Sequence, residues 1–205
     1  MEDECKVVDE NKSVWAAIAE MDTAHLRALP VVDKDGKYKA LLHYSAFAQQ
    51  LLTILNPENQ VSIATSIDLI IKTMNAQPLI VHNKDEIFKS TILVGAASDK
   101  TFSKMLDEHK SENIIVITSD REKIYEACIE RKVKLLIITS GYMLSKELKE
   151  KAQKNGVSVI MSPYTTSDTV MMIAYSTPVS FMADPDIKPV RPEDTISKIR
   201  QVLQD

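Results

Sequence analysis

Hydrophobic positions in the middle of the chain form short continuous runs, and the segments between these runs carry apolar residues at helical spacing. A short continuous apolar run is typical of a strand buried on both faces. Strands of this kind that alternate with amphipathic helices predict a mainly parallel sheet covered by helices. The predicted strands are 91–96, 113–118, 134–139 and 157–161, and the predicted helices are 100–109, 121–131, 145–155 and 166–174.

The opening part of the chain shows a different pattern, in which short strands surround two helices and a tight turn. Ser13 is typical of a helix N-cap, and the apolar residues after it predict one buried helical face. Asp33-Lys-Asp-Gly36 predicts a tight turn, with Gly36 free to take positive φ. The residues of the predicted helical face are Val14, Trp15, Ala17, Ile18 and Met21. The predicted strands are 5–8, 29–32 and 38–42, and a second helix is predicted over 45–55.

The closing segment repeats the start of the opening one. A connecting helix over 62–74 and a strand over 78–81 lead into the central pattern, and a proline-rich stretch after Pro178 leads out of it into a predicted helix over 196–203. In this stretch Thr195 occupies the N-cap place that Ser13 has in the opening copy. A repeat on both sides of a different domain predicts two related units that meet. The second copy stops at Asp205, so we expect an incomplete second unit.

Composition limits the classes of partner. The 205 residues carry a net charge of −4, with a sequence pI near 5.6, which disfavours nucleic acid as a partner. Cys5 and Cys128 have no ligand-type spacing, and two free thiols in a reducing compartment are the simpler interpretation, although a disulfide stays open. No signal peptide and no membrane-spanning run is visible. We therefore expect a cytoplasmic protein without membrane contact.

Motifs for catalysis are missing from the sequence. The four histidines stand far apart in the chain, which disfavours a metal site, and the four isolated glycines form neither a phosphate-binding loop nor a dinucleotide fingerprint. Cys128 lies in the middle of a predicted helix, and Ser140-Gly141 lacks the nucleophile-elbow pattern. We therefore expect neither catalytic nor metal-ligating residues, although catalysis by residues distant in sequence stays open.

Leu29-Pro-Val-Val-Asp-Lys-Asp-Gly36 is similar to the central signature of a CBS domain. Asp120-Arg121 and Thr139-Ser140-Gly141 are similar to the two halves of the DRTGG motif, with serine replacing the first glycine. Pro178–Asp205 resembles the first half of another CBS motif. In this order, the three motifs resemble the CBS–DRTGG–CBS insert of family II inorganic pyrophosphatases. The resemblance divides the chain into a first CBS motif (1–60), a connecting helix and strand (61–83), a DRTGG domain (84–178) and the first half of a second CBS motif (179–205).

The resemblance implies an α/β regulatory module that is not itself an enzyme. Its parent would be an inorganic pyrophosphatase, a hydrolase that needs manganese or cobalt together with magnesium and whose catalytic domains are absent here. In that family AMP and ADP inhibit, while ATP and diadenosine polyphosphates such as diadenosine tetraphosphate activate. The implied partners are these adenine nucleotides, the parent's catalytic domains and a second copy in a homodimer. No cofactor is expected for the fragment itself.

The residues implied for nucleotide binding lie where the last strand of the first CBS motif enters its last helix. Tyr44 can stack on adenine, His43 and Ser45 offer hydrogen bonds, and Arg27 could hold a phosphate. Ala46 stands where the family's usual ribose-binding aspartate is found, so that contact is missing. Ser180 and Ala183 would line the opposite wall.

Plainer interpretations of these residues stay open at the level of sequence. His43 and Tyr44 could simply end a strand, and Arg27 could be a surface charge. Asp120 could cap its helix, with Arg121, Thr139 and Gly141 in structural roles. The whole module could also serve as a dimerisation or protein-interaction scaffold without ligand, or as a small enzyme built on the loops after Thr118 and Thr139.

Overall fold

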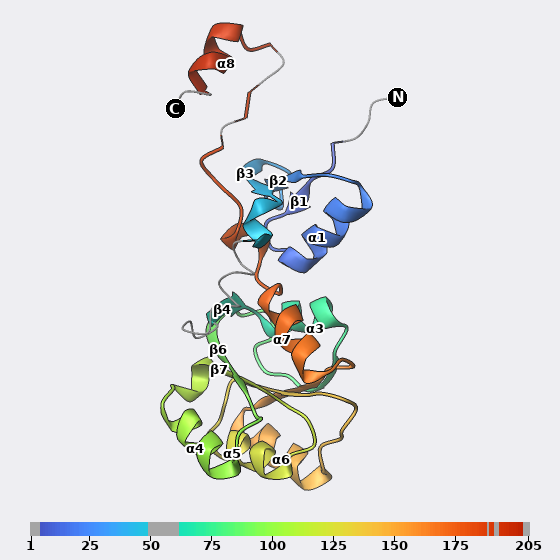
Figure 1. The fold of residues 1–205 in the computed structure, drawn as a ribbon, viewed down its shortest axis with the longest axis vertical. Helices are drawn as coiled ribbons and strands as arrows, with labels where there is room; N and C mark the ends of the chain where they lie inside the picture. Colours follow the sequence, from blue (N-terminus) through green and yellow to red (C-terminus); the bar gives the residue numbers. More distant parts are fainter. Residues whose placement is uncertain (1–4, 49–61, 188, 191–192, 203–205) are drawn as a thin grey trace.

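Two sheets of different size organise the chain. A computed structural model describes residues 5–48, 62–187, 189–190 and 193–202. A six-stranded sheet with helices on both faces lies at one end of the long axis, and a three-stranded sheet with a helix beside it lies nearer the middle (Figure 1). The sequence therefore predicted the α/β class and the change of pattern between the two units correctly.

The large sheet has four parallel strands in its middle and an antiparallel strand at each edge. Its order is β4-β6-β7-β8-β9-β5, and β6 to β9 are parallel neighbours in chain order. This confirms the parallel sheet predicted from the apolar runs. The strands are β4 (Ser62–Thr65), β5 (Gln77–Ile80), β6 (Phe88–Val94), β7 (Ile114–Thr118), β8 (Leu135–Ile138) and β9 (Ser158–Met161). The helices are α3 (Ile67–Met74), α4 (Asp99–Asp107), α5 (Glu122–Glu130), α6 (Lys146–Asn155) and α7 (Thr166–Ala174), with a 3-10 turn η1 (Ser111–Asn113).

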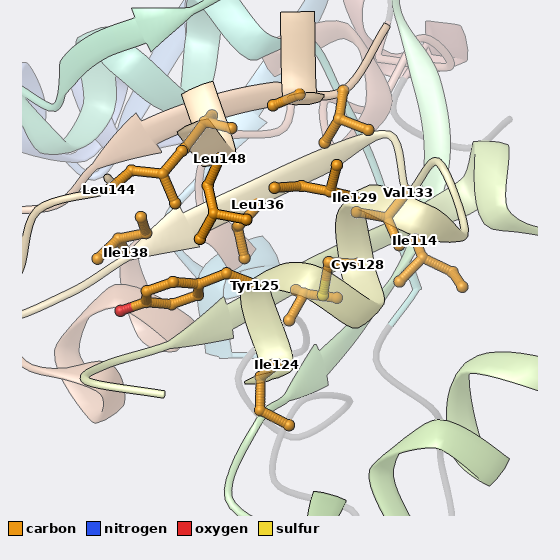
Figure 2. Close-up of a cluster of buried hydrophobic side chains, with 14 of the residues drawn as sticks. Ile114, Ile124, Tyr125, Cys128, Ile129, Val133, Leu136, Ile138, Leu144 and Leu148 are labelled. Atoms are coloured by element: carbon orange, nitrogen blue, oxygen red, sulfur yellow. The ribbon is translucent and has the colours of Figure 1, made fainter. Parts of the chain in front are cut away.

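Both faces of this sheet are buried, which explains why its strands are apolar without alternation. In β7, Ile114 and Val116 pack on the side of α4, α5 and α6 (Figure 2), whereas Ile115 and Ile117 pack on the side of α3 and α7. All four side chains are fully buried. A strand with period-two side chains and a helix layer on each face needs apolar residues at every position.

The segment before the parallel strands differs from its prediction. Residues 62–74 were expected to form one helix, but residues 62–65 form the edge strand β4, which pairs antiparallel with β6. Helix α3 begins only after Ser66, whose hydroxyl accepts the N–H of Leu69 at 3.2 Å. This cap fixes the helix start, and the four residues before it are too short a run to show strand periodicity. The segment 61–83 thus supplies both edge strands, β4 and β5, to the large sheet.

The small sheet has the order β1-β2-β3 and its own core. Ser13 caps the first helix by accepting the N–H of Ala16 at 3.2 Å, and Gly36 has φ +75° in the turn, as the sequence predicted. Residues 45–48 are helical, and the remainder of the helix predicted over 45–55 lies outside the described residues. The elements are β1 (Val8–Asp9), α1 (Val14–Thr23), β2 (Ala28–Val32) and β3 (Tyr38–His43).

Trp15 does not join the buried face of α1. Val14, Ala17 and Met21 are fully buried, but the side chain of Trp15 is 40% exposed and Ile18 is half-buried. The buried positions recur every three to four residues along the helix, and Trp15 lies about 100° around the helix from Val14. The prediction of a single face that included Trp15 was therefore wrong.

The closing segment lies along the small unit. It begins with a 3-10 turn, η2 (Val179–Phe181). The N–H of Val179 donates to the carbonyl of Lys12 at 2.8 Å, and the N–H of Ser180 donates to the carbonyl of Glu10 at 3.0 Å. Further on, α8 (Ile196–Val202) extends away from both sheets (Figure 1). Its start is capped by Thr195, whose hydroxyl accepts the N–H of Lys198 at 3.3 Å, as the repeat predicted.

Candidate functional site

A cavity of about 460 Å³ opens where β3 ends in the small unit. It forms because β2 and β3 are antiparallel, with Ala28 opposite His43, so the residues before β2 meet the residues after β3. The volume lies within the range of small-molecule sites. The lining residues are Leu26, Arg27, His43, Tyr44 and Ser45.

His43 and Ser45 form a fixed pair at this cavity. The backbone N–H of Ser45 donates to Nδ1 of His43 at 3.2 Å, and the Ser45 hydroxyl lies 2.8 Å from the same nitrogen. A nitrogen that accepts an N–H carries no proton in the neutral ring, so the hydrogen-bond network assigns the proton to Nε2. The other ring nitrogen of His43 therefore offers an Nε2–H donor that is not bonded to Ser45.

Tyr44 has an exposed ring on a fixed backbone. Its N–H donates to the carbonyl of Arg27 at 2.9 Å, which closes the end of the β2–β3 pair. The ring meets the buried ring of Phe47 edge to face, with centroids 5.5 Å apart and an interplanar angle of 83°. The Tyr44 side chain remains 55% exposed. The ring is thus oriented by one aromatic contact and available for another.

Arg27 supplies the positive charge of the cavity. Its side chain is exposed, and within the described part of the chain it forms no ion pair. The helical residues 45–48 begin at the same place, so backbone N–H groups also lie near the cavity. A guanidinium beside a flat ring and a ring N–H donor suits a ligand that has an aromatic base and a phosphate.

Three of the predicted site residues lie elsewhere. Ala46 is half-buried and packs against the core of the small unit, and Ala183 does the same from the closing segment. Ser180 is exposed, and its N–H bonds to Glu10. Within the described residues, neither Ser180 nor Ala183 lines the cavity. Leu26, which lines it, was missed, although its position directly before Arg27 could have indicated it.

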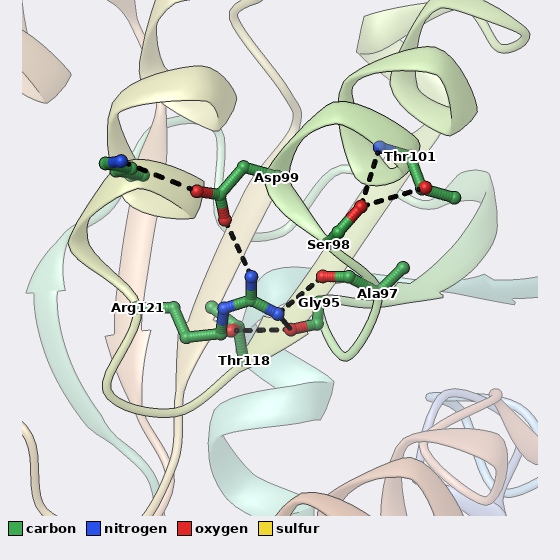
Figure 3. Close-up of polar contacts among 8 residues, drawn as sticks. Gly95, Ala97, Ser98, Asp99, Thr101, Thr118 and Arg121 are labelled. Atoms are coloured by element: carbon green, nitrogen blue, oxygen red, sulfur yellow. Dashed lines mark hydrogen bonds and ion pairs between the residues drawn. The ribbon is translucent and has the colours of Figure 1, made fainter.

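Arg121, from the DRTGG-like motif, is committed to structure (Figure 3). Its guanidinium donates to the carbonyl of Gly95 at 3.1 Å, to the carbonyl of Ala97 at 2.5 Å and to Asp99 at 2.7 Å. Arg121 itself is the N-cap residue of α5, without a side-chain cap bond. The alternative in which Asp120 caps this helix was therefore wrong, and Arg121 instead ties the loop after β6 to the start of α5.

Thr139 and Gly141 shape the turn after β8. Thr139 is fully buried, and its hydroxyl lies 2.9 Å from that of Thr166 at the start of α7. Gly141 has φ +76° and Ser140 has φ 62°, so two successive residues are in the left-handed region. This geometry supports the structural interpretation of these residues. A strand followed by such a tight reversal needs a residue without a Cβ at one of these positions.

The described residues give little support to catalysis. Among them, no group of three or more His, Cys, Asp or Glu side chains could hold a metal ion. Burial raises the pKa of the Cys128 thiol to about 12, which makes it a poor nucleophile near neutral pH. In the described part of the chain, no helix has the length and apolar character that a bilayer crossing requires.

Comparison with known proteins identifies two domain families in the chain. Residues 69–176 match the DRTGG domain, and residues 1–52 match the CBS domain. The cobalt-dependent inorganic pyrophosphatase of Clostridium perfringens is 28% identical over 186 residues, which cover 90% of this chain and 33% of that protein. The chain therefore spans about a third of the length of this curated relative.

A solved structure resembles the whole chain. The crystal structure of the CBS and DRTGG domains of the regulatory region of Clostridium perfringens pyrophosphatase, complexed with its activator diadenosine tetraphosphate, has a TM-score of 0.80 and 25% sequence identity. The match covers 100% of this chain and 89% of that one. The order of motifs predicted from sequence is thus confirmed in both sequence and fold, because the chain is homologous to that regulatory region.

Proposed function

We propose a regulatory, adenine-nucleotide-binding role for this chain, which belongs to the DRTGG domain family and carries a CBS domain ahead of its DRTGG domain. The module would control an inorganic pyrophosphatase whose catalytic domains lie outside this sequence. Our division into a first CBS motif (1–60), a connection (61–83), a DRTGG domain (84–178) and a half CBS motif (179–205) belongs to this proposal.

The observation that carries the proposal is the cavity at the end of β3. It brings together a free guanidinium, an exposed aromatic ring and a ring N–H donor, from Arg27, Tyr44 and His43. These groups match the phosphate, the base and a polar edge of a nucleotide. The related regulatory region that was crystallised with diadenosine tetraphosphate supports the adenine class.

Each residue has a distinct part in the proposed complex. The adenine stacks on the face of Tyr44 that Phe47 leaves open, and Nε2–H of His43 donates to the base or the ribose. Arg27 binds the phosphate. Ala46 offers no carboxylate to the ribose hydroxyls, so ribose recognition contributes little here. Ser180 and Ala183 act from the closing segment, by supporting the wall rather than by lining it.

We propose that AMP and ADP inhibit the parent enzyme and that ATP and diadenosine polyphosphates activate it. A diadenosine polyphosphate differs from AMP in that it can span two cavities across a homodimer, which would favour a different subunit spacing. A ligand shifts an equilibrium only by its difference in affinity for the two states. The effect reaches the catalytic domains as a change in subunit spacing, with a coupling free energy of about 1–3 kcal/mol.

Calorimetric titration with AMP and with diadenosine tetraphosphate tests the binding site. Tyr44→Ala and Arg27→Gln should each weaken binding about tenfold, because each removes one contact of about 1–2 kcal/mol. Ile87→Ala is the control, since it removes another exposed large side chain, 45% exposed, from the large unit. Equal affinity in Tyr44→Ala and Ile87→Ala, or no heat from the unchanged protein, would contradict the assignment.

A scaffold without ligand is the second candidate, and one surface favours it. Tyr142, Met143 and Tyr164 are 41%, 72% and 39% exposed beyond the ends of β8 and β9. Their loops are joined by a bond of 3.3 Å from the N–H of Ser140 to the carbonyl of Tyr164. Apolar side chains exposed together are typical of a protein contact, here a homodimer.

Sedimentation tests this contact. The variant Met143→Glu should sediment as a monomer. A dimer of the unchanged protein that nucleotides do not alter would favour the scaffold alternative.

The remaining parts of the proposal concern the parent protein. It would be a cytoplasmic hydrolase that uses manganese or cobalt together with magnesium, in line with the cobalt-dependent pyrophosphatase that the chain resembles. Neither nucleic acid nor a membrane is a proposed partner, since the net charge of −4 gives no basic surface for either.

A further inference from the structure

A second cavity, of about 360 Å³, lies at the seam between the two units. One side comes from the start of α1 in the small unit and the other from α3 on the large sheet. We propose that this seam pocket binds a small planar aromatic molecule that carries an anionic group. Domain interfaces are a preferred place for small-molecule sites. The residues used in the argument are Lys12, Trp15, Ala16, Leu69, Lys72 and Thr73.

The apolar part of the pocket is built around Trp15. Its indole is 40% exposed, although Val14 and Met21 on the same helix are fully buried. Ala16 is exposed beside it, and Leu69 is half-buried on the facing helix. A small residue next to an exposed indole leaves room for a flat ring. Stacking on an aromatic face adds to the gain from the area buried.

The charged part of the pocket is positive. Within the described residues, the ammonium of Lys12 has no ion pair. Lys72 lies 2.5 Å from Asp68, a hydrogen bond that raises the pKa of Lys72 and keeps it protonated. Asp68 neutralises much of the charge of Lys72, with Lys84 a further 3.8 Å contact of the same carboxylate. Recognition of an anionic group therefore falls mainly to Lys12.

Thr73 gives an independent indication of a ligand. The residue lines the pocket and is only 6% exposed, and in the described structure its hydroxyl has no hydrogen-bond partner. A buried hydroxyl without a partner is destabilising. The hydroxyl oxygen is covered in this structure, so an acceptor on a bound molecule would satisfy it after the Thr73 side chain turns towards the pocket.

The amide groups at the start of α1 are not part of this site. The N–H of Val14 donates to the carbonyl of Thr177 at 2.8 Å, and that of Trp15 to the carbonyl of Tyr175 at 2.9 Å. The N–H of Ala16 donates to Ser13. The helix terminus is therefore occupied by the segment that joins the two units. Selectivity rests on side chains, namely the indole, the ammonium and the hydroxyl.

Trp15 is the one tryptophan of the sequence, so all tryptophan emission comes from this pocket. The probes are 1-anilinonaphthalene-8-sulfonate, an aromatic anion, and N-phenyl-1-naphthylamine, the same ring system without the sulfonate. Energy transfer from Trp15 to each probe is titrated with the whole chain. We expect saturable transfer with both probes, and tighter binding of the anion.

Two matched substitutions separate this site from non-specific probe binding. Ala16→Phe fills the pocket, whereas Ala19→Phe places the same ring on an exposed position of the same helix, outside the pocket. Ala16→Phe should weaken both probes about tenfold or more, and Ala19→Phe should leave both unchanged. Far-ultraviolet circular dichroism and the urea midpoint confirm that both variants fold. Equal binding in the two variants would overturn the proposal.

Lys12→Gln tests the anionic part. It should weaken the sulfonate probe about fivefold and leave the uncharged probe unchanged. An equal effect on both probes, or none on either, overturns the assignment of the charge. AMP titrations of Ala16→Phe distinguish this site from the cavity at Tyr44, since AMP binding there should be intact whatever the probes show.

Discussion

Leu41 and Asp184 exchange both backbone hydrogen bonds. The N–H of Leu41 donates to the carbonyl of Asp184 at 3.0 Å, and the N–H of Asp184 donates back to the carbonyl of Leu41 at 2.9 Å. Tyr38, on the same strand, adds a bond of 2.7 Å from its hydroxyl to the carbonyl of Ile187. The closing segment thus continues the small sheet beside β3. The repeated part of that segment, which includes α8, extends away from both sheets (Figure 1), so the described residues do not show the two copies of the repeat meeting.

Breaking this pair should release the closing segment. Asp184→Pro removes the N–H donor, whereas Asp184→Ala keeps it and is the matched control. We expect the Leu41 amide to exchange with solvent about tenfold faster in Asp184→Pro, because one bond is lost and the ladder can open locally. Hydrogen exchange followed by mass spectrometry measures this. Unchanged protection of Leu41 in Asp184→Pro would mean that the bridge does not hold the segment.

Arg121 should matter for stability rather than for binding. Arg121→Ala removes donors from two carbonyls and from Asp99, so the free energy of unfolding should fall by roughly 1.5–3 kcal/mol. Lys123→Ala is the control, because its ammonium is 80% exposed and 3.8 Å from Asp99. It should change that free energy by less than about 0.5 kcal/mol. Urea denaturation measures both, and equal midpoints for the two variants would refute the structural role.

Thr65 and Ser176 join β4 to the end of α7 through a buried polar contact. Their hydroxyls are 2.8 Å apart, and that of Ser176 also donates to the carbonyl of Ile173 at 2.6 Å. Both residues are fully buried. Thr65→Val and Ser176→Ala should each lower the free energy of unfolding by about 1–2 kcal/mol. In a double-mutant cycle we expect a coupling of about 0.5–1.5 kcal/mol, and strict additivity would show that the contact is not formed.

Cys128 predicts a pH dependence of stability. Burial raises its pKa from 9.0 to about 12 in the folded protein, so between these values the unfolded chain loses a proton that the folded chain keeps. The stabilisation is complete below pH 9.0 and decreases as the pH rises towards 12, by about 1.4 kcal/mol per pH unit. Comparison with Cys128→Ala isolates this contribution. Parallel stability curves for the two proteins at alkaline pH would contradict it.

The same burial predicts thiol reactivity. Cys5 is exposed and Cys128 is buried. A disulfide reagent at about pH 8 should label one thiol rapidly in the folded protein and both in denaturant. Rapid labelling of two thiols in the folded state would show that the core around Cys128 opens. Cys5→Ser should leave almost no rapid reaction.

The elements of the large unit were predictable because their patterns are local. The apolar runs at 113–118 and 134–139 contain β7 and β8, and α7 has the predicted bounds, Thr166–Ala174. Ser13 and Thr195 were correctly predicted as caps, since a cap bond spans only three residues. The helix predicted over 62–74 failed because the first residues form an edge strand, and partners for such a strand are chosen by the sheet rather than by the chain nearby.

The two cavities also differ in whether the sequence could predict them. Arg27, His43, Tyr44 and Ser45 could be grouped from sequence, because a hairpin brings the residue before one strand to the end of the next. The seam pocket could not be found, since Trp15 and Thr73 come from different units and were assigned only to their own helices. The Trp15 side chain is exposed because it lines the seam pocket between the two units.

The sequence by itself determined the layered α/β fold, the caps and turns, and the CBS–DRTGG order, because period, propensity and capping act over a few neighbouring residues. The tertiary structure decided that residues 62–65 become an edge strand, that the Arg121 guanidinium bonds to two carbonyls and to Asp99, and that neither Ser180 nor Ala183 lines the cavity at the end of β3. These outcomes depend on the packing of segments far apart in the chain, and no local pattern encodes the distance between them.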